Sequence, residues 1–185
     1  MTLQDLVVPT YVQMLGALSR WIAKAEAQRP DGKAEPLLSA RLAPDMFPLA
    51  TQVRFACRQA QEAVFRLTGQ AFPASLQVLL DEGRDAGKRP GDLADAQARI
   101  AETIAVVEKL AADASWIHPA AAIAHALPNG MTLDLTAERY ARDWALPQFY
   151  FHVVTAYLII RAEGIEIGKI DYASHMGAYF RPPAG

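Results

Sequence analysis

Apolar residues recur at steps of three to five positions along four stretches of the chain, and this period predicts four long amphipathic helices. The first covers about residues 2–28; because Pro9 lies inside it, either the long helix begins there or a short turn precedes it. The second should begin near Asp45, a good N-cap residue, and end at Gly69. The third follows Asp92, which also suits an N-cap position.

The fourth stretch, about residues 137–163, is bounded by Thr136 as a cap and by Gly164 as a stop. Pro147 falls well inside it and lacks a backbone N–H, so we expect a kink at this proline. The remaining residues, about 165–185, should form an extended strap on the surface.

The second helix also carries a polar face, made of Arg54, Arg58, Glu62 and Arg66. We interpret it as an ordinary solvated face; an anion-binding face is the alternative, which the balanced charge of the chain disfavours. A shorter helix is expected at about residues 75–82, before a polar loop.

Between the third and fourth helices the period changes from about 3.6 to 2, which predicts a β-hairpin. Its centre is the dipeptide Asn129–Gly130, which suits a tight two-residue turn. That register places His125 opposite Asp134 on a solvent-facing side, as an ordinary cross-strand pair rather than a base with its orienting carboxylate. Pro128 lacks the N–H that such a turn uses, so a wider loop is an alternative. The two segments are residues 122–127 and 131–136.

These elements fit one domain that spans residues 1–185. Four long helices with one small hairpin predict an all-α fold, a four-helix bundle with the hairpin between its third and fourth helices. A hairpin of this size is not stable alone, so it must lie on the helices.

Charge and composition restrict the partners. Lys and Arg number 18 and Asp and Glu number 20, so the net charge is −2, and we expect no nucleic-acid binding through many phosphate contacts. The most apolar stretch, residues 144–160, contains Gln148 and His152 and is too short and too polar to span a membrane. Residues 1–6 lack a secretory pattern and Cys57 is the single cysteine, so we expect a cytoplasmic protein.

Two motifs resemble a known family. Residues 40–49 (Ala-Arg-Leu-Ala-Pro-Asp-Met-Phe-Pro-Leu) precede the second helix, and residues 145–152 (Ala-Leu-Pro-Gln-Phe-Tyr-Phe-His) lie in the fourth, followed by Thr-Ala-Tyr at 155–157 and Gly-Lys at 168–169. Together they resemble domain-of-unknown-function family 1993, bacterial proteins of the DinB-like (YfiT-like) superfamily, over residues 5–172.

The resemblance implies a DinB-like four-helix bundle that is commonly dimeric, so we expect a homodimer. Many members hold a divalent metal with three histidines, one from the second helix and an H-x-x-x-H pair from the fourth, and some use it to activate a low-molecular-weight thiol. Here His152 matches the second histidine of the pair, Gln148 stands in place of the first, and the second-helix position falls near Gln52 or Phe55. One imidazole beside an amide is a poor site for a transition metal, so we expect a bundle cavity with neither metal nor cofactor.

The candidate ligand-binding residues are therefore His152, Gln148, Gln52, Phe55 and Tyr11; no catalytic residue is assigned. For His152 we favour a core histidine that is hydrogen-bonded to a neighbouring side chain over a proton-transferring group. Gln148 fits equally a ligand contact and a partner for backbone groups freed by the kink.

Two further features have a functional and a structural interpretation. Cys57 lies near Arg54 and Arg58, which could lower its pKa, but a buried and inert cysteine is the favoured interpretation. His118 and His175 could join His152 in a metal site only if the tail folded over the mouth of the bundle.

We therefore expect a DinB-like bundle with a degenerate metal site, which binds a small apolar or amphipathic molecule in its cavity or serves as a dimeric structural module. The alternative is a metal- or thiol-dependent transferase or hydrolase.

Overall fold

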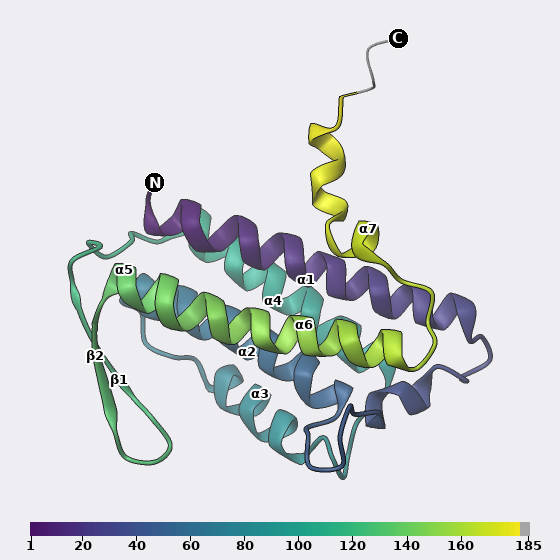
Figure 1. Cartoon of the computed structure of the whole chain (residues 1–185). Coiled ribbons are helices and arrows are strands. Elements are labelled where there is room, and N and C mark those ends of the chain that lie inside the picture. Colours follow the sequence, from purple (N-terminus) through teal and green to yellow (C-terminus); the bar gives the residue numbers. More distant parts are fainter. Residues whose placement is uncertain (182–185) are drawn as a thin grey trace.

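The computed structural model describes residues 1–181. Four long helices, α1, α2, α4 and α6, form a bundle in which α1 and α2 each contact both α4 and α6 (Figure 1). Their bounds are Leu3–Gln28, Leu49–Leu67, Leu93–Asp113 and Leu146–Ala162. The predicted bundle and hairpin are confirmed. The shorter elements are η1 (Glu35–Ser39), α3 (Ala74–Asp85), β1 (Ala122–Ala126), β2 (Thr132–Thr136), α5 (Ala137–Arg139), η2 (Tyr140–Ala145), α7 (Lys169–Tyr172) and η3 (Ser174–Tyr179).

The first helix runs without interruption through Pro9. A capping box holds its start: the Thr2 hydroxyl accepts from the Asp5 N–H (3.0 Å), and the Asp5 carboxylate accepts from the Thr2 N–H (2.9 Å). Leu3 and Val7 are buried in the core, so the turns before the proline are also held by packing. Neither a start at Pro9 nor a separate turn before it is found.

The second helix begins at Leu49, so the prediction of Asp45 as its cap is wrong. Pro48 is the N-cap with extended backbone, and the residue before a proline is disfavoured in the helical region, which keeps the preceding turn out of the helix. Gly69 follows the helix with φ of +65°, as its role as a stop predicts. Asp92 caps α4 by accepting from the Asp95 N–H at 2.7 Å.

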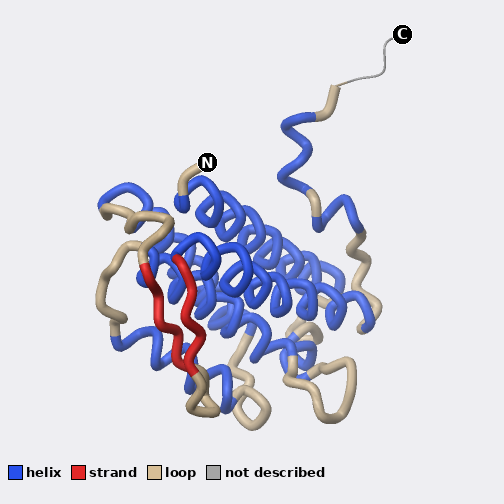
Figure 2. The backbone as a smooth tube through the Cα atoms, turned by 60° about the vertical axis from the view of Figure 1, so that its left-hand side comes forward, coloured by secondary structure: helices blue, strands red, loops and turns tan. Residues whose placement is uncertain are grey.

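The hairpin lies at one end of the bundle (Figure 2). Its register differs by one residue from the two-residue turn, because the loop includes Pro128 and the Leu127 N–H donates to the Met131 carbonyl (2.7 Å). His125 therefore pairs with Leu133 rather than with Asp134. A shift by one residue exchanges the two faces of a strand, so His125 is buried instead of solvent-facing. The wider loop was the correct alternative.

The fourth predicted helix is one helical rod with a π-helical segment, η2, before α6. Thr136 caps it by accepting from the Arg139 N–H at 3.2 Å, and Gly164 ends it with φ of +82°. The Leu146 N–H bonds five residues back to Ala141, and Pro147 follows directly, so the wide turn lies where the proline removes a donor. None of the helices within residues 1–181 is both long and apolar enough to cross a membrane.

The C-terminal segment, residues 169–181, is not the expected extended strap. Its first turn, α7, docks on α1, where Tyr172 stacks on Trp21 (5.9 Å between ring centroids) and Asp171 pairs with Lys24 (2.5 Å). The following turn, η3, projects away from the bundle (Figure 1). The tail residues 182–185 lie outside the described part.

Candidate functional site

The polar face of α2 is covered, so its interpretation as a solvated face is wrong. Arg54 and Glu62 are each 4% exposed. Helix α3 packs along α2, and the buried His125 of the hairpin reaches Glu62. Gly83 permits the close approach of α3, because a Cβ at this position would lie 2.3 Å from the ring of Phe55.

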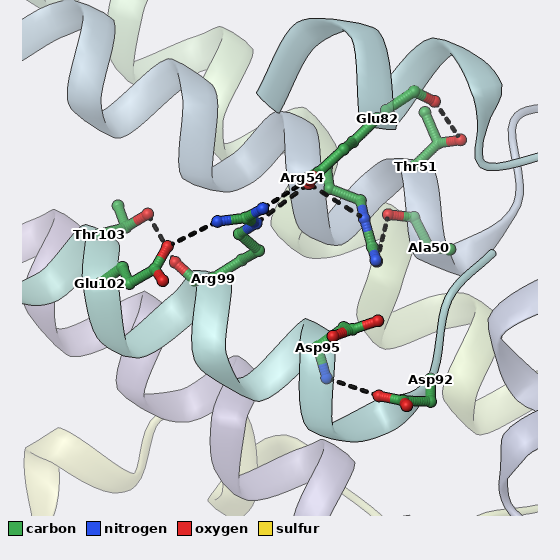
Figure 3. A network of polar contacts seen from close by, with 10 residues as sticks. Ala50, Thr51, Arg54, Glu82, Asp92, Asp95, Arg99, Glu102 and Thr103 are labelled. Atoms are coloured by element: carbon green, nitrogen blue, oxygen red, sulfur yellow. Dashed lines mark hydrogen bonds and ion pairs between the residues drawn. The ribbon is translucent and has the colours of Figure 1, made fainter. Parts of the chain in front are cut away.

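One half of this covered face is a structural network that fastens α3 to α2 and α4 (Figure 3). Glu82 of α3 pairs with Arg99 of α4 (2.5 Å) and Arg54 of α2 (3.9 Å), while the Thr51 hydroxyl donates to the Gly83 carbonyl (2.8 Å). A hollow of about 410 Å³ lies beside it. The charged side chains of the network pair with one another, so no ligand is needed to balance their charge.

The sequence-predicted residues Gln52, Phe55 and His152 lie together between α2 and α6. His152 Nδ1 is 2.9 Å from Gln52 Oε1, and the Gln52 amide nitrogen donates to the Phe47 carbonyl (3.1 Å). That second bond turns the amide oxygen towards the imidazole, so Nδ1 carries the proton and donates it. The Phe55 ring lies edge-on to the imidazole, with 5.3 Å between centroids.

Burial keeps His152 neutral. Its side chain is 8% exposed, and desolvation, with a smaller contribution from the charge of Arg58, lowers its pKa to about 4. The geometry agrees with a core histidine hydrogen-bonded to a neighbouring side chain.

These residues do not fit the metal that the resemblance implies. The donors at the corresponding positions are one imidazole and two amides, and the Gln52 oxygen and the His152 Nδ1 bond to each other instead of converging on an ion. Within residues 1–181 no group of three or more His, Cys, Asp or Glu side chains is arranged to hold a metal. Cys57 is fully buried, which raises its pKa to about 12, so its thiol is not an activated nucleophile.

The other two candidates lie apart from this pair. Tyr11 is buried in the core, where its ring packs edge-on against Phe149 at 4.7 Å between centroids. Gln148, one turn before His152, lines a separate pocket. His118 and His175 do not join His152 in a metal-binding group within residues 1–181. His175 lies in η3, which projects away from the bundle (Figure 1), and His118 lies in the loop before the hairpin, where its Nδ1 accepts from the Ala120 N–H (3.1 Å).

The pocket that Gln148 lines opens between α2, α3, the hairpin and the start of the fourth helical rod, and we call it the Glu62 pocket. Its volume is about 490 Å³, within the usual range for small-molecule sites. Trp144 contributes an aromatic wall. The lining consists of Arg58, Gln59, Glu62, Leu80, Arg84, His125, Ala126, Leu127, Pro128, Trp144 and Gln148.

A buried carboxylate organises the polar end of this pocket. Glu62 binds Arg58 (2.7 Å) and Arg66 (3.2 Å), each one helical turn away on α2. His125 Nδ1 lies 3.8 Å from Glu62 Oε1, too far for a hydrogen bond. Arg84 of α3 is exposed and forms no ion pair with the described residues.

Among the described residues, three buried polar atoms around Glu62 are unpaired, and two of them belong to residues that line the pocket. His125 Nδ1, Arg58 Nε and Arg66 Nε are buried and have no hydrogen-bond partner within residues 1–181. His125 is 8% exposed; burial lowers its pKa, Glu62 raises it, and Arg66 and Arg58 lower it further. Its imidazole is therefore held towards its neutral form.

Sequence reasoning named Arg58 only within the disfavoured alternative of an anion-binding face, and it missed His125 and Arg84 as members of the same site. The signal for His125 was present: Pro128 argues against the tight turn, and the wider loop places His125 on the inner face. Arg84 carries no comparable signal, because only the packing of α3 brings it beside the hairpin.

Comparisons with known proteins agree with the fold and do not assign an activity. The chain is similar to a crystal structure of a DinB family member from Shewanella denitrificans, with 34% sequence identity, a TM-score of 0.73, and coverage of 98% of this chain and 96% of that one. No curated protein matches the chain. The family model described as domain of unknown function (DUF1993) matches residues 3–173. The chain therefore belongs to the DUF1993 family and has the helical fold of a DinB family member.

Proposed function

We propose that this protein binds a small organic molecule in the Glu62 pocket. The observation that carries the proposal is the buried His125, whose Nδ1 has no hydrogen-bond partner in the wall of a 490 Å³ cavity. Buried polar groups in folded proteins are nearly always paired, so an unpaired one in a pocket wall is a group that a bound ligand can pair.

The lining supports a molecule with both apolar and polar parts. Leu80, Leu127 and Trp144 are apolar members of the lining, while Gln59 and Gln148 offer amide groups. The pocket lies beside the Gln52–His152 pair rather than around it, so the proposed ligand contacts Gln148 among the sequence-predicted residues. Neither a metal nor a cofactor is needed for binding of this kind.

A thermal-shift screen of small aromatic and aliphatic compounds tests the proposal. A ligand at a hundred times its Kd stabilises the native state by about 2.7 kcal/mol, which is roughly a 5–10 °C rise in Tm for a chain of this size. The same compounds are applied to Gln148→Trp, which fills the mouth of the pocket, and to Gln77→Trp, a matched change at an exposed position of α3 outside it.

Compounds that stabilise the wild type should also stabilise Gln77→Trp and should fail to stabilise Gln148→Trp. The proposal is wrong if no compound raises the Tm of the wild type, or if Gln148→Trp responds as the wild type does.

A second candidate function, a homodimeric structural module, is favoured by two exposed apolar surfaces. On α6, Phe151 (60% exposed) and Leu158 (45%) lie seven residues apart and so face the same way. On the projecting C-terminal segment, Ile170 is 87% exposed and Phe180 is 80% exposed. A short helical turn with this much exposed apolar surface gains stability when another chain covers it, and a second copy supplies a matching apolar face on its α6.

A further inference from the structure

We infer that the molecule bound in the Glu62 pocket is an organic oxyanion, whose carboxylate or phosphate group lies against Arg58, Arg84 and His125 and whose apolar body packs on Trp144. This inference rests on the proposed function, because it names the chemical class that the same pocket binds.

The polar end of the pocket has an excess of positive charge. Arg58 and Arg66 share the single carboxylate of Glu62, and Arg84 has no anionic partner among the described residues. Arg58, Arg84 and Glu62 line the pocket and leave a formal charge of 2 − 1 = +1, in a chain whose net charge is −2. Arg66, which also binds Glu62, lies outside the lining. A neutral ligand leaves this excess uncompensated, whereas an oxyanion balances it.

The neighbouring network shows that excess positive charge is not general on this side of the molecule. There Arg54 and Arg99 both meet Glu82, and Arg99 also binds Glu102 at 2.9 Å. Arg89 pairs with Asp85. Each arginine of that network thus has a carboxylate partner, whereas the Glu62 pocket leaves Arg84 without one.

The unpaired atoms also match an oxyanion. The buried Arg58 Nε carries an N–H that no protein oxygen accepts, and guanidinium groups bind carboxylate and phosphate oxygens through paired N–H donors. Among the described residues, His125 Nδ1 is a second unpaired nitrogen on a residue that lines the pocket. Next to His125, at 5.1 Å between ring centroids, Trp144 provides an aromatic surface suited to a flat ring, and Leu127 adds to the apolar lining.

Binding of an anion should be coupled to protonation of His125. An added negative charge nearby stabilises the imidazolium form, so the affinity for an oxyanion rises as the pH falls towards the pKa of this histidine. The groups that face the imidazole are Glu62, Arg58 and Arg66 of α2, Tyr140 and Trp144 of η2, and Arg84 of α3 across the pocket.

Isothermal titration of the full chain with four related probes tests the inference. Benzoate and phenyl phosphate present the two oxyanions, benzyl alcohol is a neutral analogue and benzylamine a cationic one. We expect both oxyanions to bind at least about tenfold more tightly than benzyl alcohol, because charge-assisted hydrogen bonds are stronger than neutral ones, and benzylamine to bind least. The ratio of the Kd for benzoate to the Kd for phenyl phosphate identifies which oxyanion the pocket prefers.

Arg84→Gln should weaken the binding of the preferred oxyanion by roughly ten- to a hundredfold and leave benzyl alcohol unchanged. Arg84 is exposed and unpaired, so the variant should fold normally. Arg89→Gln, an exposed arginine just beyond α3 that does not line the Glu62 pocket, is the matched control and should leave all affinities unchanged. His125→Gln should remove the strengthening of benzoate binding that accompanies a fall in pH below 6.5, because the pKa of His125 lies below that value.

The possible failures are distinguishable. Equal binding of benzoate, phenyl phosphate and benzyl alcohol overturns the oxyanion inference and leaves the pocket as a small-molecule site. Oxyanion binding that Arg84→Gln does not weaken also overturns it, because the anion then binds elsewhere. If none of the four probes binds and the thermal-shift screen gives no ligand, the proposed function itself fails.

Discussion

The neutral imidazole of His152 should make the stability of the protein depend on pH. Its pKa is about 4 in the folded chain, compared with 6.5 for a free histidine, so between these values the unfolded chain binds a proton that the folded chain excludes. Well above pH 6.5 the imidazole is neutral in both the folded and the unfolded chain, so it does not change the free energy of unfolding. As the pH falls towards 4, it should cost on the order of 3 kcal/mol of the free energy of unfolding.

Urea denaturation across this pH range measures the effect. His152→Gln retains a side chain that can hydrogen-bond to Gln52 and removes the titration, so its stability should fall less on acidification than that of the wild type. The same change at the exposed His118 is the matched control. Equal pH dependence of wild type and His152→Gln would show that burial of this imidazole does not govern acid stability.

At the level of single residues, helical spacing predicts which side chains are buried, but it does not predict which side chain on another helix each of them contacts. The spacing places His152 and Gln148 on one face of a helix. In the structure, however, His152 forms a hydrogen bond with Gln52, whereas Gln148 lines the Glu62 pocket. Tyr11 is a core residue with Phe149 as its neighbour. The partner of a side chain on another helix depends on how the two helices pack, and the period of one helix does not contain that information.

At the level of elements, the packing of α3 on α2 depends on the absence of a side chain at Gly83. In an exposed helix, glycine to alanine is stabilising by about 0.5–1 kcal/mol. Here the added methyl group would meet the Phe55 ring, which Phe47 and His152 hold from other sides. Gly83→Ala should therefore destabilise the protein by roughly 1–3 kcal/mol in chemical denaturation.

Two companion variants make this prediction specific. Gly87→Ala, just beyond α3, places its methyl group in open space and should leave the stability unchanged or slightly higher. Phe55→Leu combined with Gly83→Ala should recover part of the loss, because the shorter side chain relieves the overlap. A stabilising Gly83→Ala would mean that α3 is not packed closely on Phe55.

Hairpin register shows why elements are easier to predict than the faces they present. The strands and their connection were predictable from the period of two and from Asn129–Gly130. The register depended on whether Pro128 belongs to the loop, and one residue of difference moved His125 from solvent to the wall of the Glu62 pocket. The candidate site was therefore missed through a local choice of turn length, although the hairpin itself was found.

At the level of the whole molecule, the bundle was predictable because each long helix carries its own apolar period and most carry their own caps. The elements that cover the polar face of α2 were not predictable, because α3 and the hairpin contact this face through residues that are distant from it in sequence. The same limit applies to the C-terminal segment: its composition does not indicate that α7 docks on α1 while η3 projects away.

The exposed apolar surfaces give a prediction about assembly. If the C-terminal segment of one copy covers the α6 face of another, light scattering coupled to size exclusion should give twice the 20.2 kDa of the chain. Phe151→Glu and Ile170→Glu should each shift the mass to that of a monomer, because a buried charge without a partner strongly opposes association. Val78→Glu, at an apolar residue of α3 that is 45% exposed, should remain dimeric. A monomeric wild type at all concentrations, or a dimer that both Phe151→Glu and Ile170→Glu leave intact, would contradict this mode of assembly, since these two side chains belong to the two surfaces that it buries.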